Sequence, residues 1–205
     1  MTRRGNWSKL GGSLIMAAAL SLSGCMTTVP PVDVTRFFNG PTVPTAGAIT
    51  IAPADPRDAG SLEFRTTANA VAASLTRIGF LVLDEKAPNA TFSAVVEIRR
   101  ETIEPSRERR SPVSVGVGGS TGSYGSGVGV GIGIDLSGKP KPVVTTQLRV
   151  QIRKVSDNQA VWEGRAETSA KQGTPAAQPG IAAGKLADAL FRQYPGESGK
   201  TVTIQ

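Results

Sequence analysis

The sequence predicts one α+β domain, in which a mixed or antiparallel sheet of about five strands packs against two helices. Apolar and polar residues alternate over five short segments, which is the period of a half-buried strand. Over two other segments apolar residues recur every three or four positions, which is typical of an amphipathic helix. A glycine-rich insert, residues 113–138, interrupts the domain between its third and fourth expected strands.

Residues 1–24 are typical of a secretory signal peptide. Arg3, Arg4 and Lys9 supply the basic start, and an apolar run follows over residues 14–22. That run is shorter than the roughly 20 residues a transmembrane helix requires. We therefore expect this segment to direct export and then to be removed.

The signal ends in Leu22-Ser23-Gly24-Cys25, which resembles a bacterial lipobox. In that motif the chain is cut between Gly24 and Cys25, and the cysteine thiol receives diacylglycerol. Cys25 is the single cysteine of the chain, so it cannot form an internal disulfide. We expect a diacylglyceryl cysteine here, and acyl chains hold a protein firmly at a bilayer. Because Met26 rather than aspartate follows, the outer membrane is the expected location, with the domain in the periplasm.

Residues 25–46 are expected to form a lipidated N-terminus and a proline-rich tether, because positions 26–46 hold four prolines and little periodicity. The periplasmic domain is then expected over residues 47–205. Its first strand is predicted at 48–52. Ser61 can cap a helix that Gly79 ends, and further strands are predicted at 80–83 and 91–99. The expected inner face of this helix consists of Phe64, Ala68, Val71, Leu75 and Ile78.

After the insert, residues 144–153 alternate most clearly, and a hairpin leads into a second alternating segment, 160–170. Parity requires an odd turn, with three residues expected, to place Trp162 on the face of Ile152. A left-handed Asn158 favours pairing Ile152 with Trp162. Charge favours another register, which sets Arg153 against Glu163 and Arg149 against Glu167. In either register these four residues are expected to form surface ion pairs.

A last helix is predicted to be capped by Thr174 and Pro175 and to become regular near Ile181. It ends at Pro195-Gly196, and residues 201–204 could add an edge strand. Its expected inner stripe consists of Ala182, Leu186, Ala189, Leu190 and Gln193.

The insert holds ten glycines, and its valines and isoleucines occupy every second position of two arms. Three interpretations remain open. The first is a flexible surface loop. The second is a β-ribbon that places its aliphatic face on its own domain or on a neighbouring subunit. The third is a hairpin that enters the membrane together with other copies.

Composition excludes several classes of chemistry. The chain has no histidine, which removes imidazole metal sites and Ser-His-Asp triads, and no metal or cofactor is expected. Residues 133–139 match part of a P-loop, but Pro140 stands where its Mg²⁺-binding hydroxyl must be, so nucleotide binding is not expected. Nucleic acid binding is not expected either. Glu97, Glu101 and Glu163 are the carboxylates that a minor, enzymatic alternative would use.

Several segments together resemble a known family: the lipobox, Val34-Thr35-Arg36-Phe37, Ser61-Leu62-Glu63-Phe64, the glycine-rich middle, Val161 to Ala166, and Leu190 to Pro195. They are similar to the bacterial lipoproteins catalogued as domain of unknown function 4136. The resemblance implies no catalytic residue. We expect a non-enzymatic envelope lipoprotein that binds another envelope protein or polymer. The alternative is a homo-oligomeric assembly in which the glycine-rich hairpins associate or enter the membrane.

Overall fold

The computed structural model describes residues 29–38, 40, 43–105, 113–122, 125–134 and 140–205. Over these ranges the chain forms one α+β domain with a mixed seven-stranded sheet, ordered β3-β2-β4-β7-β8-β1-β9, and two α-helices. The strands are β1 Val32–Phe37, β2 Gly47–Pro53, β3 Phe80–Val82, β4 Phe92–Ile103, β7 Val143–Lys154, β8 Ala160–Lys171 and β9 Thr201–Ile204. The helices are α1 Leu62–Arg77 and α2 Pro179–Phe191.

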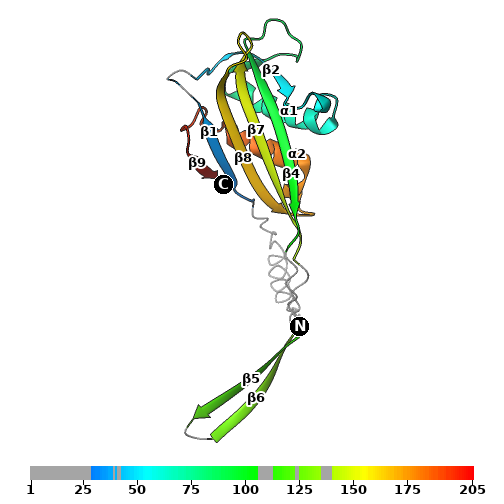
Figure 1. Ribbon diagram of the computed structural model, residues 1–205, viewed down its shortest axis with the longest axis vertical. Helices are drawn as coiled ribbons and strands as arrows, with labels where there is room; N and C mark the ends of the chain where they lie inside the picture. Colours follow the sequence, from blue (N-terminus) through cyan, green and yellow to red (C-terminus); the bar gives the residue numbers. More distant parts are fainter. Residues whose placement is uncertain (1–28, 39, 41–42, 106–112, 123–124, 135–139) are drawn as a thin grey trace, which may run out of the picture.

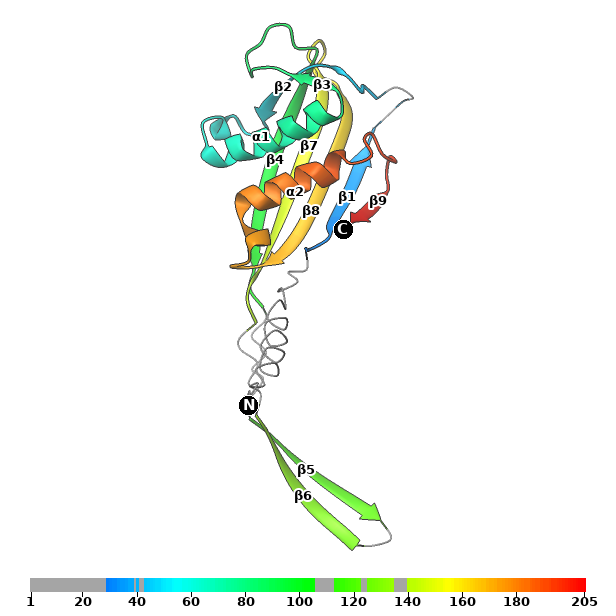
Figure 2. The ribbon, with the colours of Figure 1, turned by 180° about the vertical axis from the view of Figure 1, so that it is seen from behind.

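Both helices lie on one face of the sheet, as Figure 2 shows, and the opposite face is turned to the viewer in Figure 1. Strand β2 runs parallel to β3 and β4, and the remaining neighbours are antiparallel. The hydrophobic core lies between this face and the helices, around Ile49, Leu75, Leu148 and Leu186. In the described ranges, no helix combines the length and hydropathy needed to cross a bilayer.

The α+β class and the two helices are confirmed, but the sheet is larger than the five strands expected. The additional strand β1, next to the edge strand β9, lies in the segment predicted as a tether. It pairs with β8 on one side and β9 on the other, and it buries Val32 and Val34. The sheet therefore begins at Val32 rather than near Gly47. Residues 201–204 form the expected edge strand.

Helix α1 begins and ends where the sequence predicts. Ser61 is its N-cap, and the Ser61 Oγ accepts a hydrogen bond from the Phe64 backbone N–H at 3.0 Å. Gly79 follows its end with φ +111°, a conformation that favours glycine. Val71 and Leu75 are buried. Phe64, Ala68 and Ile78 pack against the core at its margin.

The β7–β8 hairpin takes the register that the turn favoured. Ile152 is the partner of Trp162, and Asn158 has φ 56°. The turn differs from the expected three residues: Lys154 N–H donates to Gln159 O, which closes a four-residue turn. A bulge beside Ile152 then restores the parity that puts Trp162 on the inner face.

The start and the end of the last helix differ from expectation. Thr174 precedes a short 3₁₀ helix, η2 Pro175–Ala177, and its hydroxyl donates to Lys171 O instead of capping. Helix α2 then begins at Pro179 and ends at Phe191. The predicted stripe is correct for Ala182, Leu186, Ala189 and Leu190 but wrong for Gln193, which lies beyond the helix with φ 60° and is exposed. Phe191 is buried in its place.

The glycine-rich insert contains two paired strands, β5 Val113–Gly122 and β6 Gly125–Ile134, which form a separate antiparallel sheet. We call this hairpin the ribbon. Two paired strands are what the second and third interpretations above predict, the β-ribbon and the hairpin that enters the membrane. Leu22, Ser23, Gly24 and Cys25, with the rest of the predicted signal, lie outside the described residues.

Candidate functional site

Arg36 joins the N-terminal strand to the end of helix α2. Its side chain is 3% exposed on the inner face of β1. The guanidinium donates to three backbone carbonyls: Nε to Leu190 O at 3.0 Å, and Nη2 to Ala189 O at 3.1 Å and Arg192 O at 2.7 Å. Two of these carbonyls belong to the last turn of α2 and the third to its C-cap residue, Arg192. At this end no intrahelical donor is available and the helix dipole favours a cation. Arg36 therefore caps α2 from a different element.

Aromatic side chains surround the same end of α2. Trp162 of β8 stacks on Phe191 with ring centroids 5.5 Å apart, and its centroid lies 5.2 Å from that of Tyr194. The indole Nε1 donates to Pro195 O at 3.1 Å, and the Tyr194 hydroxyl donates to Pro44 O at 2.8 Å. We call Arg36, Trp162, Phe191, Tyr194 and their carbonyl partners the β1–α2 junction.

Two glycines make room for this junction. A Cβ at Gly164 would lie 2.3 Å from Trp162 Cη2 and 2.7 Å from Leu190 Cδ1, so the indole packs directly on the β8 backbone. Gly196 has φ +84°, and a Cβ there would lie 2.6 Å from Arg36 Cδ. Three of the segments that carry the family resemblance, those around Arg36, Trp162 and Phe191, thus meet in one structural unit. Arg36, Trp162 and Tyr194 all donate to backbone carbonyls. The junction therefore links β1, β8 and Pro44 to the end of α2 and the residues that follow it.

Tyr194 makes the stability of this junction sensitive to alkaline pH. Burial raises the pKa of its phenol well above the ordinary 10.0. Above about pH 10 the unfolded phenol ionises while the native one keeps its proton, so stability falls as the pH rises. We expect Tyr194→Phe to flatten the decline in melting temperature between about pH 10 and pH 12. Near neutral pH the variant should cost about 1 kcal/mol through the lost hydrogen bond. An equally steep decline in both proteins would contradict this assignment.

The face of the sheet opposite the helices carries polar and charged side chains. We call it the open face; it is formed by the outward positions of β4, β7, β8 and β1, among them Asp33, Thr35, Arg99, Gln147, Arg149, Gln151, Glu163, Arg165 and Glu167. Arg149 Nε donates to Glu163 at 2.9 Å and Gln147 Nε2 to Glu167 at 2.9 Å. The charge-favoured register was wrong, because Arg149 lies opposite Arg165 and reaches Glu163 diagonally. Such exposed pairs contribute at most about 1 kcal/mol.

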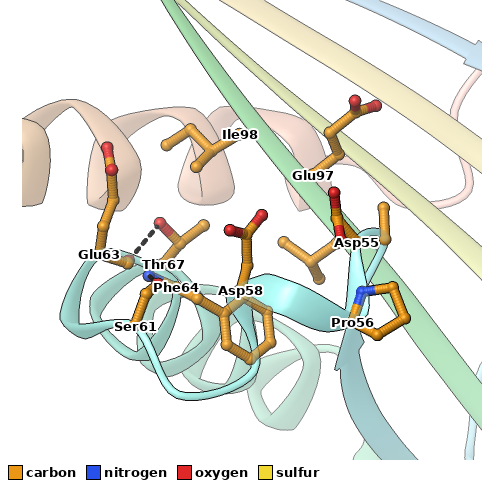
Figure 3. A pocket seen from close by; sticks show the side chains of 11 residues that line it. Asp55, Pro56, Asp58, Ser61, Glu63, Phe64, Thr67, Glu97 and Ile98 are labelled. Atoms are coloured by element: carbon orange, nitrogen blue, oxygen red, sulfur yellow. Dashed lines mark hydrogen bonds between the residues drawn. The ribbon is translucent and has the colours of Figure 1, made fainter.

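A shallow pocket lies beyond the end of β2, between β4 and the N-terminus of α1 (Figure 3). Its volume is about 550 Å³, and four carboxylates line it: Asp55, Asp58, Glu63 and Glu97. Figure 3 shows Glu63 on the far side of the pocket from Asp55 and Glu97. The side-chain hydrogen bond from Arg57 holds the pKa of Asp55 below its ordinary range. An acid held in its ionised form is suited to attracting cations rather than to donating a proton.

The three carboxylates considered for catalysis are not brought together. Glu97 lines the pocket and accepts from Arg99 Nε at 2.7 Å. Glu163 lies two strands away, where it accepts from Arg149 and Gln151. Glu101 is exposed near the end of β4. Among the residues described, no three Asp, Glu, His or Cys side chains cluster closely enough to hold a metal ion.

Sequence reasoning missed Arg36, although a signal was present. Val32, Val34 and Arg36 occupy alternate positions of VDVTRF, which is the period of a strand with one arginine on its apolar face. A charged residue is rarely buried without partners. Those partners are carbonyls of a helix more than 150 positions away, and the amino-acid pattern does not show them.

The fold and the matched motifs define a class of single-domain α+β proteins with helices on one face of a mixed sheet. The chain belongs to the family described as Domain of unknown function (DUF4136), whose model matches residues 37–196. It is 34% identical to an uncharacterized protein of Zymomonas mobilis, over 92% of this chain and 84% of that protein.

One solved structure of low sequence identity supports the likeness in fold. A PDZ domain protein from Parabacteroides distasonis superposes with a TM-score of 0.50 at 10% identity, over 85% of this chain. The match spans 39% of that protein. A PelC dodecamer from Paraburkholderia phytofirmans has a TM-score of 0.38 at 17% identity, over 77% of this chain and 93% of that one.

Proposed function

We propose that this protein is a non-enzymatic lipoprotein, anchored in the outer membrane through Cys25, whose periplasmic domain binds another component of the cell envelope. The observation that carries the proposal is the lipobox Leu22-Ser23-Gly24-Cys25 at the end of an export signal, with the chain's only cysteine at the modified position. The arrangement of the domain supports a binding role. Its buried polar groups at the β1–α2 junction are used for packing. The sheet face opposite the helices (Figures 1 and 2) is the one that carries the outward charged residues of β7 and β8.

The anchor is tested by Cys25→Ala, with Met26→Ala as the matched control beside it. We expect Cys25→Ala to abolish incorporation of labelled palmitate and to shift the protein from the membrane to the aqueous fraction. Met26→Ala should retain both properties. Mass spectrometry of the mature N-terminus should find a diacylated cysteine as its first residue. An unmodified thiol, or labelling that persists in Cys25→Ala, would contradict the proposal.

The binding surface is tested with photo-crosslinking residues placed one at a time in the lipidated protein. Arg165 and Glu167 lie exposed on the open face of β8, and Thr66 and Ala73 lie exposed on the outer side of α1. We expect one discrete crosslinked species from the β8 positions and none from the α1 positions. Equal crosslinking from both sides would argue against a role for the open face.

The pairing of β5 with β6 favours one further candidate, an oligomer in which the hairpins associate. The mass of the lipidated protein in detergent, measured with and without residues 113–138, tests it. An oligomer that becomes a monomer on deletion is the expected result for this candidate. A monomer in both cases excludes it.

A further inference from the structure

The large sheet is joined at one end to three connecting segments: the one that leads back to Cys25, and the two that lead to and from the ribbon. Ile103, the last residue of β4, is the partner of Val143, the first residue of β7, and Val143 pairs with Lys171 of β8. The segment that leads to Cys25 departs beside them, because Pro31 O accepts from Thr168 Oγ1 at 2.8 Å. Figures 1 and 2 both show β1 beginning at the end of the sheet where β4 finishes. We call this the anchor end.

The backbone register makes the ribbon two-faced. Successive positions of a strand alternate between faces, so residues that are partners across the ribbon share a face. One face takes the pairs Val113–Ile134, Val115–Ile132 and Val117–Val130. The other takes Ser114–Gly133, Gly116–Gly131, Gly118–Gly129 and Ser120–Gly127. All aliphatic pairs thus occupy one face, and the other holds only glycine and serine.

This aliphatic face requires a cover. An isolated two-stranded hairpin is marginally stable in water, and in the described part of the chain the ribbon pairs with no strand of the large sheet. The open face is a poor cover, because placing aliphatic residues over Arg149, Glu163 and Glu167 would desolvate charges. The ribbon strands themselves contain no charged residue. Their sequence flanks, residues 104–112 and 135–142, hold five basic residues (Arg107, Arg109, Arg110, Lys139 and Lys141) and three acidic ones (Glu104, Glu108 and Asp135). Uncharged strands between flanks with a small basic excess suit a lipid surface with anionic headgroups.

The lengths of the connections bring the ribbon to that surface. The seven residue steps from Cys25 to Val32 span at most about 25 Å when fully extended. A lipid on Cys25 therefore keeps the anchor end close to the bilayer. The connections to the ribbon, residues 104–112 and 135–142, start from the same end and each reach about 30 Å. The anchor and the ribbon can thus meet one leaflet together.

We propose that the ribbon lies flat in the boundary between headgroups and acyl chains of the leaflet that holds Cys25. The aliphatic face rests on the acyl chains, and the Gly/Ser face is turned to water. It lies in the interface rather than across the membrane, because the outer edges of β5 and β6 pair with no other described strand, and unpaired edges are not tolerated in hydrocarbon. This inference rests on the proposed anchor and names the lipid surface as a second contact.

The depth of single probes tests the inference. In the lipidated protein Cys25 is modified, so a cysteine introduced elsewhere is the only free thiol. Val130→Cys, Gly131→Cys and Asp157→Cys are labelled with an environment-sensitive fluorophore and bound to phosphatidylethanolamine/phosphatidylglycerol vesicles with quenchers at set depths. We expect shallow quenchers to act several-fold more on position 130 than on 131. Position 157, in the β7–β8 turn at the opposite end of the sheet, should not respond. Equal quenching at 130 and 131, or deep quenching at both, would overturn the proposal.

Vesicle flotation of the unlipidated Cys25→Ser chain separates the ribbon from the anchor. We expect weak binding that Val130→Lys reduces several-fold, because the aliphatic contact is lost and a charge is placed at the interface, while Ser120→Lys on the other face leaves it unchanged. An unchanged melting temperature shows that the domain of each variant is folded. If the wild-type protein does not float, the anchor fails. If the wild-type protein floats while the probe at position 130 stays in water, the anchor stands and the ribbon proposal is wrong. The same conclusion holds if the ribbons associate with one another without lipid.

Discussion

Arg36→Ala is expected to lower the free energy of unfolding by about 3 kcal/mol or more. The substitution removes a buried guanidinium that donates to Ala189, Leu190 and Arg192 carbonyls. Each carbonyl left without a donor carries its own desolvation cost of about 1–3 kcal/mol, reduced where water enters the space. Denaturant unfolding, followed by far-UV circular dichroism, measures the change.

The neighbouring position on β1 provides the control. Thr35 lies on the opposite face of the same strand and shares one hydroxyl contact with Thr201 at 2.7 Å. Thr35→Ala should therefore cost less than about 1 kcal/mol. Arg36→Lys should be intermediate, because an ammonium retains the charge near the helix end but lacks the planar fork. A loss for Arg36→Ala no larger than that for Thr35→Ala would show that Arg36 does not cap α2.

Trp162→Ala is expected to cost about 3–5 kcal/mol, the range for removing a large aromatic side chain from a core. The indole is 1% exposed and lies between Phe191, Tyr194 and the backbone of Gly164. Phe191 and Tyr194 pack on each other, and Tyr194 is also held by its hydrogen bond to Pro44 O, so a cavity should remain. Thermal and denaturant unfolding by circular dichroism measure the loss.

Trp162→Phe separates packing from hydrogen bonding. It keeps a ring for Phe191 but removes the donor to Pro195 O, so we expect roughly half the loss of the alanine variant. Val161→Ala, at the bulge beside Trp162, is the control. Val161 is only partly buried at the margin of the core, so this change should cost about 1 kcal/mol or less. A loss below about 1.5 kcal/mol for Trp162→Ala would contradict a central role of the indole in the core.

Much of the fold could be predicted from local periodicity. Val144, Leu148, Val150 and Ile152 are buried as the alternation indicates, because successive side chains of a strand point to opposite faces. The spacing of Val71 and Leu75 identified α1 for the corresponding reason in a helix. The hairpin register was also decided locally, by Asn158 in a left-handed conformation. Cross-strand charge predicted another register and was wrong. Arg149 reaches Glu163 diagonally in the observed register, and an exposed ion pair is worth at most about 1 kcal/mol.

The missed elements depend on contacts between distant segments. Strand β1 is short, and two prolines precede it, so it resembles a tether until β8 and β9 are seen on either side of it. Gln193 was expected on the inner stripe because the helical period extends to it, but the chain leaves the helix after Phe191 and turns Tyr194 toward Trp162. The capping of α2 by Arg36 belongs to the same class of tertiary contact.

By itself the sequence determined the family resemblance and the strands and helices whose apolar residues repeat at short range. It also predicts the export signal and the modified cysteine, which stay predictions. Only the tertiary structure decided the number and order of the strands, the junction around Arg36 and Trp162, and the departure of tether and ribbon from one end of the sheet. The physical reason is the separation along the sequence between the residues that interact. Periodicity records which face of an element avoids water, whereas a buried cation or a strand order depends on which distant backbone groups arrive beside it.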